Sequence, residues 1–439
     1  MRAVALTLVC LTLGGCTGIG DLFGSTEAPP LPGERISVLQ QGSEIEPTPA
    51  LQGVAVRLPR PQRVPDWPQA GGYPDRAMHH LEFAEAPQVA WSVSAGSGSS
   101  STSFLTARPV VAGGRVVTMD AFGQVSAFEA ATGRALWRTD VTPRGEGYAV
   151  VAGGVALAGD RVLVGSGYGQ VIALDAATGQ EQWRVSVAAP VRAAPTVWGD
   201  RVLVITAENQ TVALGLSDGQ RIWQHQGIQE SAGLLGGASP STDGTIVIAP
   251  YSSGELVALR LDTGRLIWGD NLAAIRRQSA VSALSDIRGL PVIDRGLVYA
   301  VSHSGRTAAI ELRSGNRVWE REVGGLETPW IAGDWLFLVS ADGEVVCLNR
   351  RDGGVRWVTQ LPRWTDPDRR RGPIDWAGPV LASDRLVVVG SNGEAVALSP
   401  YSGQVLGVLR LPGATRVAPA LADGTLYILT DTATLVALR

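Results

Sequence analysis

The residue types that most often perform catalysis are few in this chain and lie in unrelated contexts. Its four histidines are His79, His80, His225 and His303, and only three cysteines occur in 439 residues. The sequence has no Gly-rich loop ending in Gly-Lys-Ser or Gly-Lys-Thr, no Cys-x-x-Cys pair and no His-Glu-x-x-His motif, which would indicate phosphate, redox or zinc chemistry. We interpret His303 as a solvated turn residue rather than a metal ligand. These spacings assemble no nucleophile, base and orienting group, so we predict no catalytic residue and no metal site.

One cysteine lies in a pattern that predicts covalent modification. Met1-Arg2 precedes an apolar run, Ala3 to Leu13, which ends in Gly14-Gly15-Cys16. A short apolar stretch ending in small residues is typical of a cleavable export signal and is too short for a spanning helix. Small residues directly before a cysteine resemble the bacterial lipobox, which implies cleavage after Gly15 and lipidation of Cys16; an ordinary signal peptide cut nearby is the alternative. Thr17, rather than aspartate, follows, which by resemblance to the enteric sorting rule favours the periplasmic face of the outer membrane.

The other two cysteines predict no disulfide. Cys10 would leave with the signal peptide, so Cys347 would remain as the only unmodified thiol of the mature chain. It stands between Val346 and Leu348, at a position where similar segments elsewhere in this chain have alanine. We therefore interpret Cys347 as a packed small apolar residue rather than a nucleophile.

A cassette of a turn followed by tryptophan recurs along the chain and predicts the elements that position these residues. Its copies are Ala127 to Trp137, Ala173 to Trp183, Ala213 to Trp223, Ala258 to Trp268, Ala309 to Trp319, Cys347 to Trp357 and Ala397 to Gly407, the last without an indole. An eighth copy begins at Ala437 and stops at Arg439. A period of roughly 40 to 50 residues is the signature of a propeller or a solenoid.

The spacing of the cassettes also predicts the number of blades. Val89-Ala-Trp91-Ser-Val93 lies one period before Trp137 and can supply the strand that the eighth copy lacks. We therefore expect an all-β fold, an eight-bladed β-propeller with four-stranded antiparallel blades, whose last blade is closed by the N- and C-terminal strands. The small first residue of each cassette leaves room for a large indole. Blade-docking roles are predicted for Trp91, Trp137, Trp183, Trp223, Trp268, Trp319 and Trp357.

Composition and the proline-rich N-terminal region predict the remaining organisation. Charged residues are 18% of the chain and the formal net charge is −4 without a basic stripe, so nucleic acid is not an expected partner. Segments such as Ala28 to Pro32 and Glu46 to Pro49 lack periodicity and are typical of a tether. We expect a cleaved signal peptide at 1–15, lipidated Cys16 and a tether over 16–84, and the propeller at 85–439. Trp67-Pro68 and Met78 to Phe83 are expected to begin docking onto the ring.

The cassettes resemble the repeats of pyrroloquinoline-quinone (PQQ) type propellers, which include quinoprotein alcohol dehydrogenases and non-enzymatic members. Together with the lipobox, the tether and eight short blades, the chain resembles the BamB family of lipoproteins in the outer-membrane β-barrel assembly machinery. Pro30 to Val38, Leu284 to Pro291 and Trp376 to Val380 resemble its alphaproteobacterial branch. The resemblance implies a scaffold without enzymatic activity or cofactor. Its implied partners are the periplasmic part of BamA, other subunits of the machinery and unfolded outer-membrane proteins.

The resemblance also implies where the partner binds. In the family two neighbouring loops make the contact, and here they match Ser231 to Pro240 and Ser282 to Gly289. The implied partner-binding residues are Leu234, Leu235, Asp286, Ile287 and Arg288, with the hydrophobic contact on Leu234 and the acidic contact on Asp286. Leu235 and Arg288 replace an arginine and an aspartate of the enteric pattern. From the residues alone, the leucines could instead tuck against the top of a blade.

Two other functions fit part of this pattern. A periplasmic PQQ-dependent dehydrogenase would need a catalytic aspartate, calcium ligands and usually a disulfide of adjacent cysteines, and the chain has no adjacent cysteine pair. A scaffold for another envelope complex would share every feature described above. A partner experiment is what distinguishes that last alternative.

Overall fold

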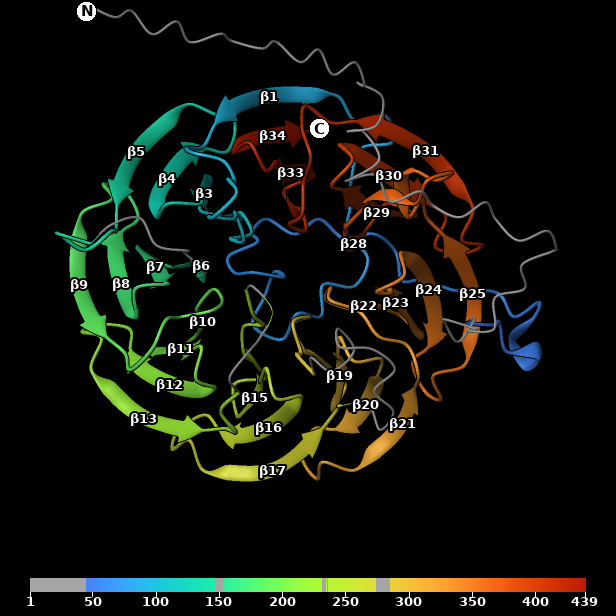
Figure 1. Ribbon diagram of the computed structural model, residues 1–439, viewed down its shortest axis with the longest axis horizontal. Coiled ribbons are helices and arrows are strands. Elements are labelled where there is room, and N and C mark those ends of the chain that lie inside the picture. The colour runs from blue at the N-terminus through green and yellow to red at the C-terminus, as the bar shows by residue number, and fades with distance from the viewer. Residues whose placement is uncertain (1–44, 147–152, 231–233, 235, 274–284) are drawn as a thin grey trace, which may run out of the picture. The chain divides into compact units, whose positions relative to one another are not determined.

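The fold is an all-β ring of blades around a central channel (Figure 1). The computed structural model describes residues 45–146, 153–230, 234, 236–273 and 285–439, and residues 45–439 form one compact unit. Eight antiparallel sheets of four strands each are arranged as blades, which confirms the predicted eight-bladed propeller. Alternating apolar residues and glycine turns explain the strands locally, because each short strand is bounded by residues that allow a tight reversal.

Blades 1 to 7 follow the chain, each from its innermost to its outermost strand. Blade 1 is β2 (Val110–Ala112), β3 (Arg115–Met119), β4 (Gln124–Glu129) and β5 (Ala135–Asp140); blade 2 is β6 (Gly153–Ala158), β7 (Arg161–Ser166), β8 (Gln170–Asp175) and β9 (Glu181–Ser186). Blade 3 is β10 (Thr196–Trp198), β11 (Arg201–Ile205), β12 (Gln210–Gly215) and β13 (Arg221–Gln226); blade 4 is β14 (Ser241–Thr242), β15 (Ile246–Pro250), β16 (Glu255–Arg260) and β17 (Leu266–Asn271). Blade 5 is β18 (Val292–Asp294), β19 (Leu297–Val301), β20 (Thr307–Glu311) and β21 (Arg317–Arg321); blade 6 is β22 (Trp330–Ala332), β23 (Trp335–Val339), β24 (Glu344–Asn349) and β25 (Val355–Gln360). Blade 7 is β28 (Trp376–Ala382), β29 (Arg385–Gly390), β30 (Glu394–Leu398) and β31 (Val405–Arg410).

Blade 8 joins the two ends of the described chain. Its strands are β32 (Ala420–Ala422), β33 (Thr425–Leu429), β34 (Thr434–Leu438) and, as the outermost strand, β1 (Val89–Ser94). β1 pairs antiparallel with β34, and Trp91 lies opposite Ala437. The predicted closure by both terminal strands is therefore confirmed. Because β1 pairs with β34, the outer edge of β34 does not remain unpaired.

Each cassette tryptophan connects its blade to the next one. The indole Nε1–H donates to a backbone carbonyl of the following blade, and the ring lies against the turn glycine of that blade's cassette. The pairs are Trp91 with Ala130 (3.1 Å), Trp137 with Ala176 (3.0 Å), Trp183 with Leu216 (3.1 Å), Trp223 with Leu261 (2.9 Å), Trp268 with Leu312 (2.8 Å), Trp319 with Arg350 (2.8 Å) and Trp357 with Pro400 (3.0 Å). We call each such indole a latch. Gly407 stands in place of an indole in blade 7, and the two outer strands of the following blade, β34 and β1, are not joined by a cassette turn.

Residues 64–81 form a strap that bonds to every blade in turn. Backbone or side-chain hydrogen bonds join it to blade 8 at Val64, blade 1 at Trp67, blade 2 at Pro68, blade 3 at Gln69, blade 4 at Pro74, blade 5 at Asp75, blade 6 at His79 and blade 7 at Leu81. Its trace is the blue segment inside the ring in Figure 1. These contacts are at the end of each innermost strand that precedes the hairpin to the second strand, so the strap lies at that end of the channel.

The compact unit begins earlier in the chain than the expected end of the tether. Residues from Ile45 onward belong to the compact unit, although a tether was expected as far as residue 84. The 3-10 helix η2 (Pro49–Leu51) packs beside β25, where Thr48 and Val355 exchange hydrogen bonds. The segment lacks periodicity because successive residues bond to different blades rather than to one strand. Residues 1–44, including the expected signal peptide and Cys16, lie outside the described residues.

Two smaller features complete the description of the fold. The charged insertion after blade 6 forms an exposed hairpin of β26 (Trp364–Asp366) and β27 (Arg371–Pro373). In the described part of the chain, no helix is long and apolar enough to cross a membrane.

Cys347 is fully buried in β24, and burial raises the pKa of its thiol well above the usual value. Both effects suppress formation of the reactive thiolate. A chain beginning at Ile45 contains no other cysteine. We therefore expect no reaction with a thiol reagent at mildly alkaline pH in the folded protein and one reactive thiol after denaturation. Rapid modification of the folded protein would contradict this packing.

Candidate functional site

The loops that lead into the innermost strands lie at the end of the channel opposite the strap. An antiparallel blade places its successive connections at alternate ends, so the loops before β14 and β18 share one face. These loops contain the residues that the sequence singled out for partner binding. We call this end of the ring the loop face.

Asp286 and Arg192 hold the backbone of the first loop. The Leu234 N–H donates to Asp286 Oδ2 at 2.7 Å, and Arg192 Nη2 donates to the Leu234 carbonyl at 2.6 Å. Arg192 also donates to the Gly236 carbonyl at 3.0 Å and lies 3.3 Å from Asp286 Oδ1. Burial raises the pKa of the Asp286 carboxyl, and the positive charge of Arg192 opposes this shift. Leu234 is thus held at its backbone, and its side chain is partly exposed.

The structure separates the five predicted contact residues into different roles. Asp286 is 2% exposed, and Ile287, which is 1% exposed, belongs to the apolar core between blades 4 and 5. Neither residue therefore offers its side chain to a partner. The expected direct contact by Asp286 disagrees with this burial, because Arg192 of a different loop already occupies the carboxylate. Leu234 and Arg288 are partly exposed, and Leu235 lies outside the described residues.

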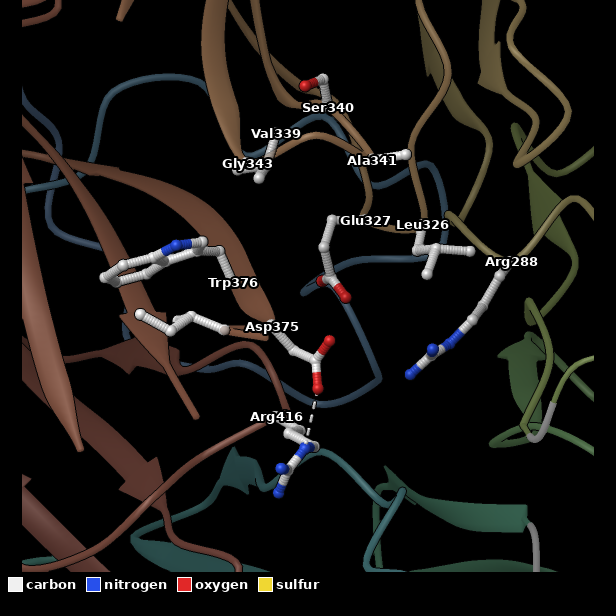
Figure 2. Close-up of a pocket in the computed structure, with 11 residues that line it drawn as sticks. Arg288, Leu326, Glu327, Val339, Ser340, Ala341, Gly343, Asp375, Trp376 and Arg416 are labelled. Carbon is white, nitrogen blue, oxygen red and sulfur yellow. Dashed lines mark hydrogen bonds and ion pairs between the residues drawn. The ribbon is translucent and has the colours of Figure 1, made fainter. Parts of the chain in front are cut away.

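A mixed-charge cavity lies beside this loop at the channel mouth. Arg288, Glu327, Asp375 and Arg416 point into the same space of about 180 Å³ (Figure 2). Arg416 Nε donates to Asp375 Oδ2 at 3.0 Å, and its Nη1 pairs with Asp431.

Glu327 pairs with Arg108 at 3.4 Å, and Arg108 also donates to Thr328 Oγ1 at 3.1 Å. Burial raises the pKa of the Glu327 carboxyl, and the charges of Arg108 and Arg288 oppose that shift. The cavity wall therefore combines ionisable side chains from several loops of the loop face with apolar residues such as Ile374 and Trp376.

Sequence reasoning did not find Arg108, Arg192, Glu327 or Arg416. A signal was present, since an arginine stands four residues before the innermost strand in three blades, as Arg192 before β10, Arg288 before β18 and Arg416 before β32. Aligning the repeats at the innermost strand, rather than at the tryptophan cassette, would have revealed these three arginines.

His303 is half-buried rather than solvated, and burial lowers the pKa of its imidazole. Its backbone N–H donates to the Asp286 carbonyl at 2.9 Å, so the turn supports the second loop. Among the described residues, no group of three or more His, Cys, Asp or Glu side chains is placed to hold a metal ion.

Fold, latches and repeats define a PQQ-like repeat propeller. The family model described as "Outer membrane protein assembly factor BamB" matches residues 83–151 and 121–359. The chain belongs to the BamB family. BamB of Escherichia coli is 32% identical over 284 residues, which is 64% of this chain and 72% of that protein. BamB of Alkalilimnicola ehrlichii is 42% identical over 272 residues, 62% of this chain and 69% of the relative.

Solved structures show the same fold across different functions. BamB from Moraxella catarrhalis is 22% identical with a TM-score of 0.68, covering 81% of this chain and 100% of its own. The quinohemoprotein alcohol dehydrogenase of Comamonas testosteroni is 16% identical with a TM-score of 0.66, covering 86% of this chain and 81% of its own. At these identities the likeness describes the architecture and not the activity.

Proposed function

We propose that this protein is a non-enzymatic scaffold lipoprotein of the outer-membrane protein assembly complex. In this role it binds the periplasmic part of BamA and assists the delivery and insertion of β-barrel proteins. Cleavage after Gly15 and lipidation of Cys16 anchor it to the periplasmic face of the outer membrane. Membership in the BamB family, whose curated relatives carry the name of outer-membrane protein assembly factors, is the observation that carries this proposal.

The loop face supports the proposal physically. A partly exposed leucine on a backbone clamped by two charged side chains is a pre-organised apolar contact, since little loop entropy remains to be lost on binding. Leu234 is the proposed hydrophobic contact and Arg288 a proposed polar contact. Positioning roles are assigned to Asp286, Ile287 and Arg192, which hold the loops in shape.

The two alternative functions, a quinoprotein dehydrogenase and a scaffold for another envelope complex, predict different observations. The likeness to quinoprotein dehydrogenases is one of fold, and the curated relatives with sequence similarity carry the assembly-factor name instead. A scaffold for another envelope complex predicts a different captured partner. Identification of the partner in membranes therefore tests the proposal directly.

Leu234→Glu is expected to reduce capture of BamA at least about tenfold, because a carboxylate replaces the apolar contact at the proposed interface centre. The measurement is the amount of BamA that co-purifies with the full-length chain from detergent-solubilised membranes. The loop's hydrogen bonds use backbone atoms of Leu234, so the fold should persist.

Leu266→Glu is the matched control. Leu266 lies on outer strand β17 of blade 4, the blade that the Leu234 loop enters, and it is 51% exposed. This variant should capture BamA as wild type does. Equal capture by both variants would contradict the assignment of the loop face, and wild-type protein found only in the soluble fraction would contradict the lipid anchor. Asp286→Arg is a poor probe because it would bury a cation beside Arg192.

A further inference from the structure

The strap lies against a second, smaller cavity at the channel mouth, of about 40 Å³, which Ala70 lines together with Arg192, Gly236 and Arg288. Ala70 of the strap packs with Ala194, Ala238 and Leu290 in one buried apolar cluster. A Cβ on Gly71 would lie 2.7 Å from Leu290 Cδ1, so the strap meets the loop without spare room. The strap therefore borders this second cavity, and Arg288 lines both cavities.

The charges that line the two cavities are paired with one exception. Arg192 lies 3.3 Å from Asp286, Arg108 lies 3.4 Å from Glu327, and Arg416 pairs with Asp375 and Asp431. Within the described ranges, no carboxylate lies within ion-pair distance of Arg288. One arginine of the wall thus has no acidic partner of its own.

Arg288 is placed where an incoming group would meet it. Its Nε lies 3.9 Å from the position that a Cβ on Gly236 would take, and the side chain lines both cavities. Figure 2 shows its guanidinium directed toward the middle of the cavity, with the carboxylates of Glu327 and Asp375 across the same space. Burial, and to a smaller extent the charge of Arg288, lowers the pKa of Arg108, and the charge of Arg288 also opposes the rise in the pKa of the Glu327 carboxyl.

We infer that the cavity of about 180 Å³ receives one carboxylate of an acidic side chain from the protein partner, with Arg288 as the recognising cation. The inference rests on the proposed function, because Arg288 also lines the second cavity, which adjoins the Leu234 loop through Arg192 and Gly236. A space of about 180 Å³ holds several water molecules and therefore a short acidic side chain. A planar guanidinium binds a carboxylate through two parallel hydrogen bonds, which favours this group over a hydroxyl or an amide.

The test uses the full chain and the purified periplasmic part of BamA from the same organism. Arg288→Gln is expected to raise the Kd at least about tenfold and to flatten its dependence on salt, because an ion pair at the interface is lost. Arg313→Gln is the matched control, since Arg313 is an exposed arginine of the same blade, between β20 and β21 at the opposite end. It should leave the Kd unchanged.

A charge exchange identifies the partner's residue. Arg288→Glu should bind weakly, and replacing one partner acid by lysine should restore its binding but not that of wild type. If Leu234→Glu weakens binding while Arg288→Gln does not, the proposed function stands and this inference is overturned. If the binding of BamA is unchanged but sulfate or free glutamate raises the Tm of wild type and not of Arg288→Gln, the cavity takes a free anion and the inference is again overturned.

Discussion

A chain that begins at Gly96 is expected to lose cooperative folding, whereas one that begins at Ile45 is expected to unfold at the same temperature as the mature protein. The shorter chain lacks both the strap and β1. Loss of β1 exposes the outer edge of β34 and removes the latch of Trp91. With net contributions of about 0.5 to 1.5 kcal/mol for each hydrogen bond, the loss for β1 alone is roughly 5 kcal/mol or more. This is a large part of the stability of a typical domain.

A third chain separates the two contributions. A chain that begins at Glu85 retains β1 but lacks the strap, so its Tm should lie between those of the other two. Circular dichroism during heating and size-exclusion chromatography measure the outcome. A chain from Gly96 that melts cooperatively within about 4 °C of the Ile45 chain would show that the ring does not depend on closure by both ends.

Trp223→Ala is expected to lower the free energy of unfolding by about 3 to 5 kcal/mol, the range for removing a buried large aromatic side chain. Trp223 is 8% exposed, and its indole donates to the Leu261 carbonyl at 2.9 Å. The ring lies so close to Gly264, which has a φ of +67°, that a Cβ there would be 2.5 Å from Trp223 Cε3. Only glycine suits both the left-handed backbone and this contact.

Trp198→Ala is the matched control in the same blade. Trp198 is 41% exposed and lies on the innermost strand β10, so its removal should cost about 1 kcal/mol. Urea denaturation of both variants gives the two free energies. Equal losses would mean that the latch contributes nothing beyond ordinary surface packing.

Local chemistry explains why the blades were predictable. The turn glycines, the alternating apolar residues and the tryptophans each lie within one repeat, so their spacing predicted strands, blade number and the pairing of Trp91 with the last cassette.

The strap and the site were less predictable for a common reason. Residues 64–81 obtain their hydrogen bonds from all the blades in turn, which leaves no periodic signal in the segment itself. The two loops of the site were predicted as neighbours, but the burial of Asp286 depends on Arg192, which is distant in sequence. A charged residue is expected at the surface of a protein. Only the tertiary structure shows that an oppositely charged side chain pairs with it inside the fold.

The sequence by itself determined the repeat, the number of blades and the order in which they close, because these depend on residues within one period. Only the tertiary structure decided which charged side chains support the loops, which one remains without an acidic partner, and at which end of the channel the strap lies. Those properties depend on distances between residues of different blades, and such distances are set when the ring closes.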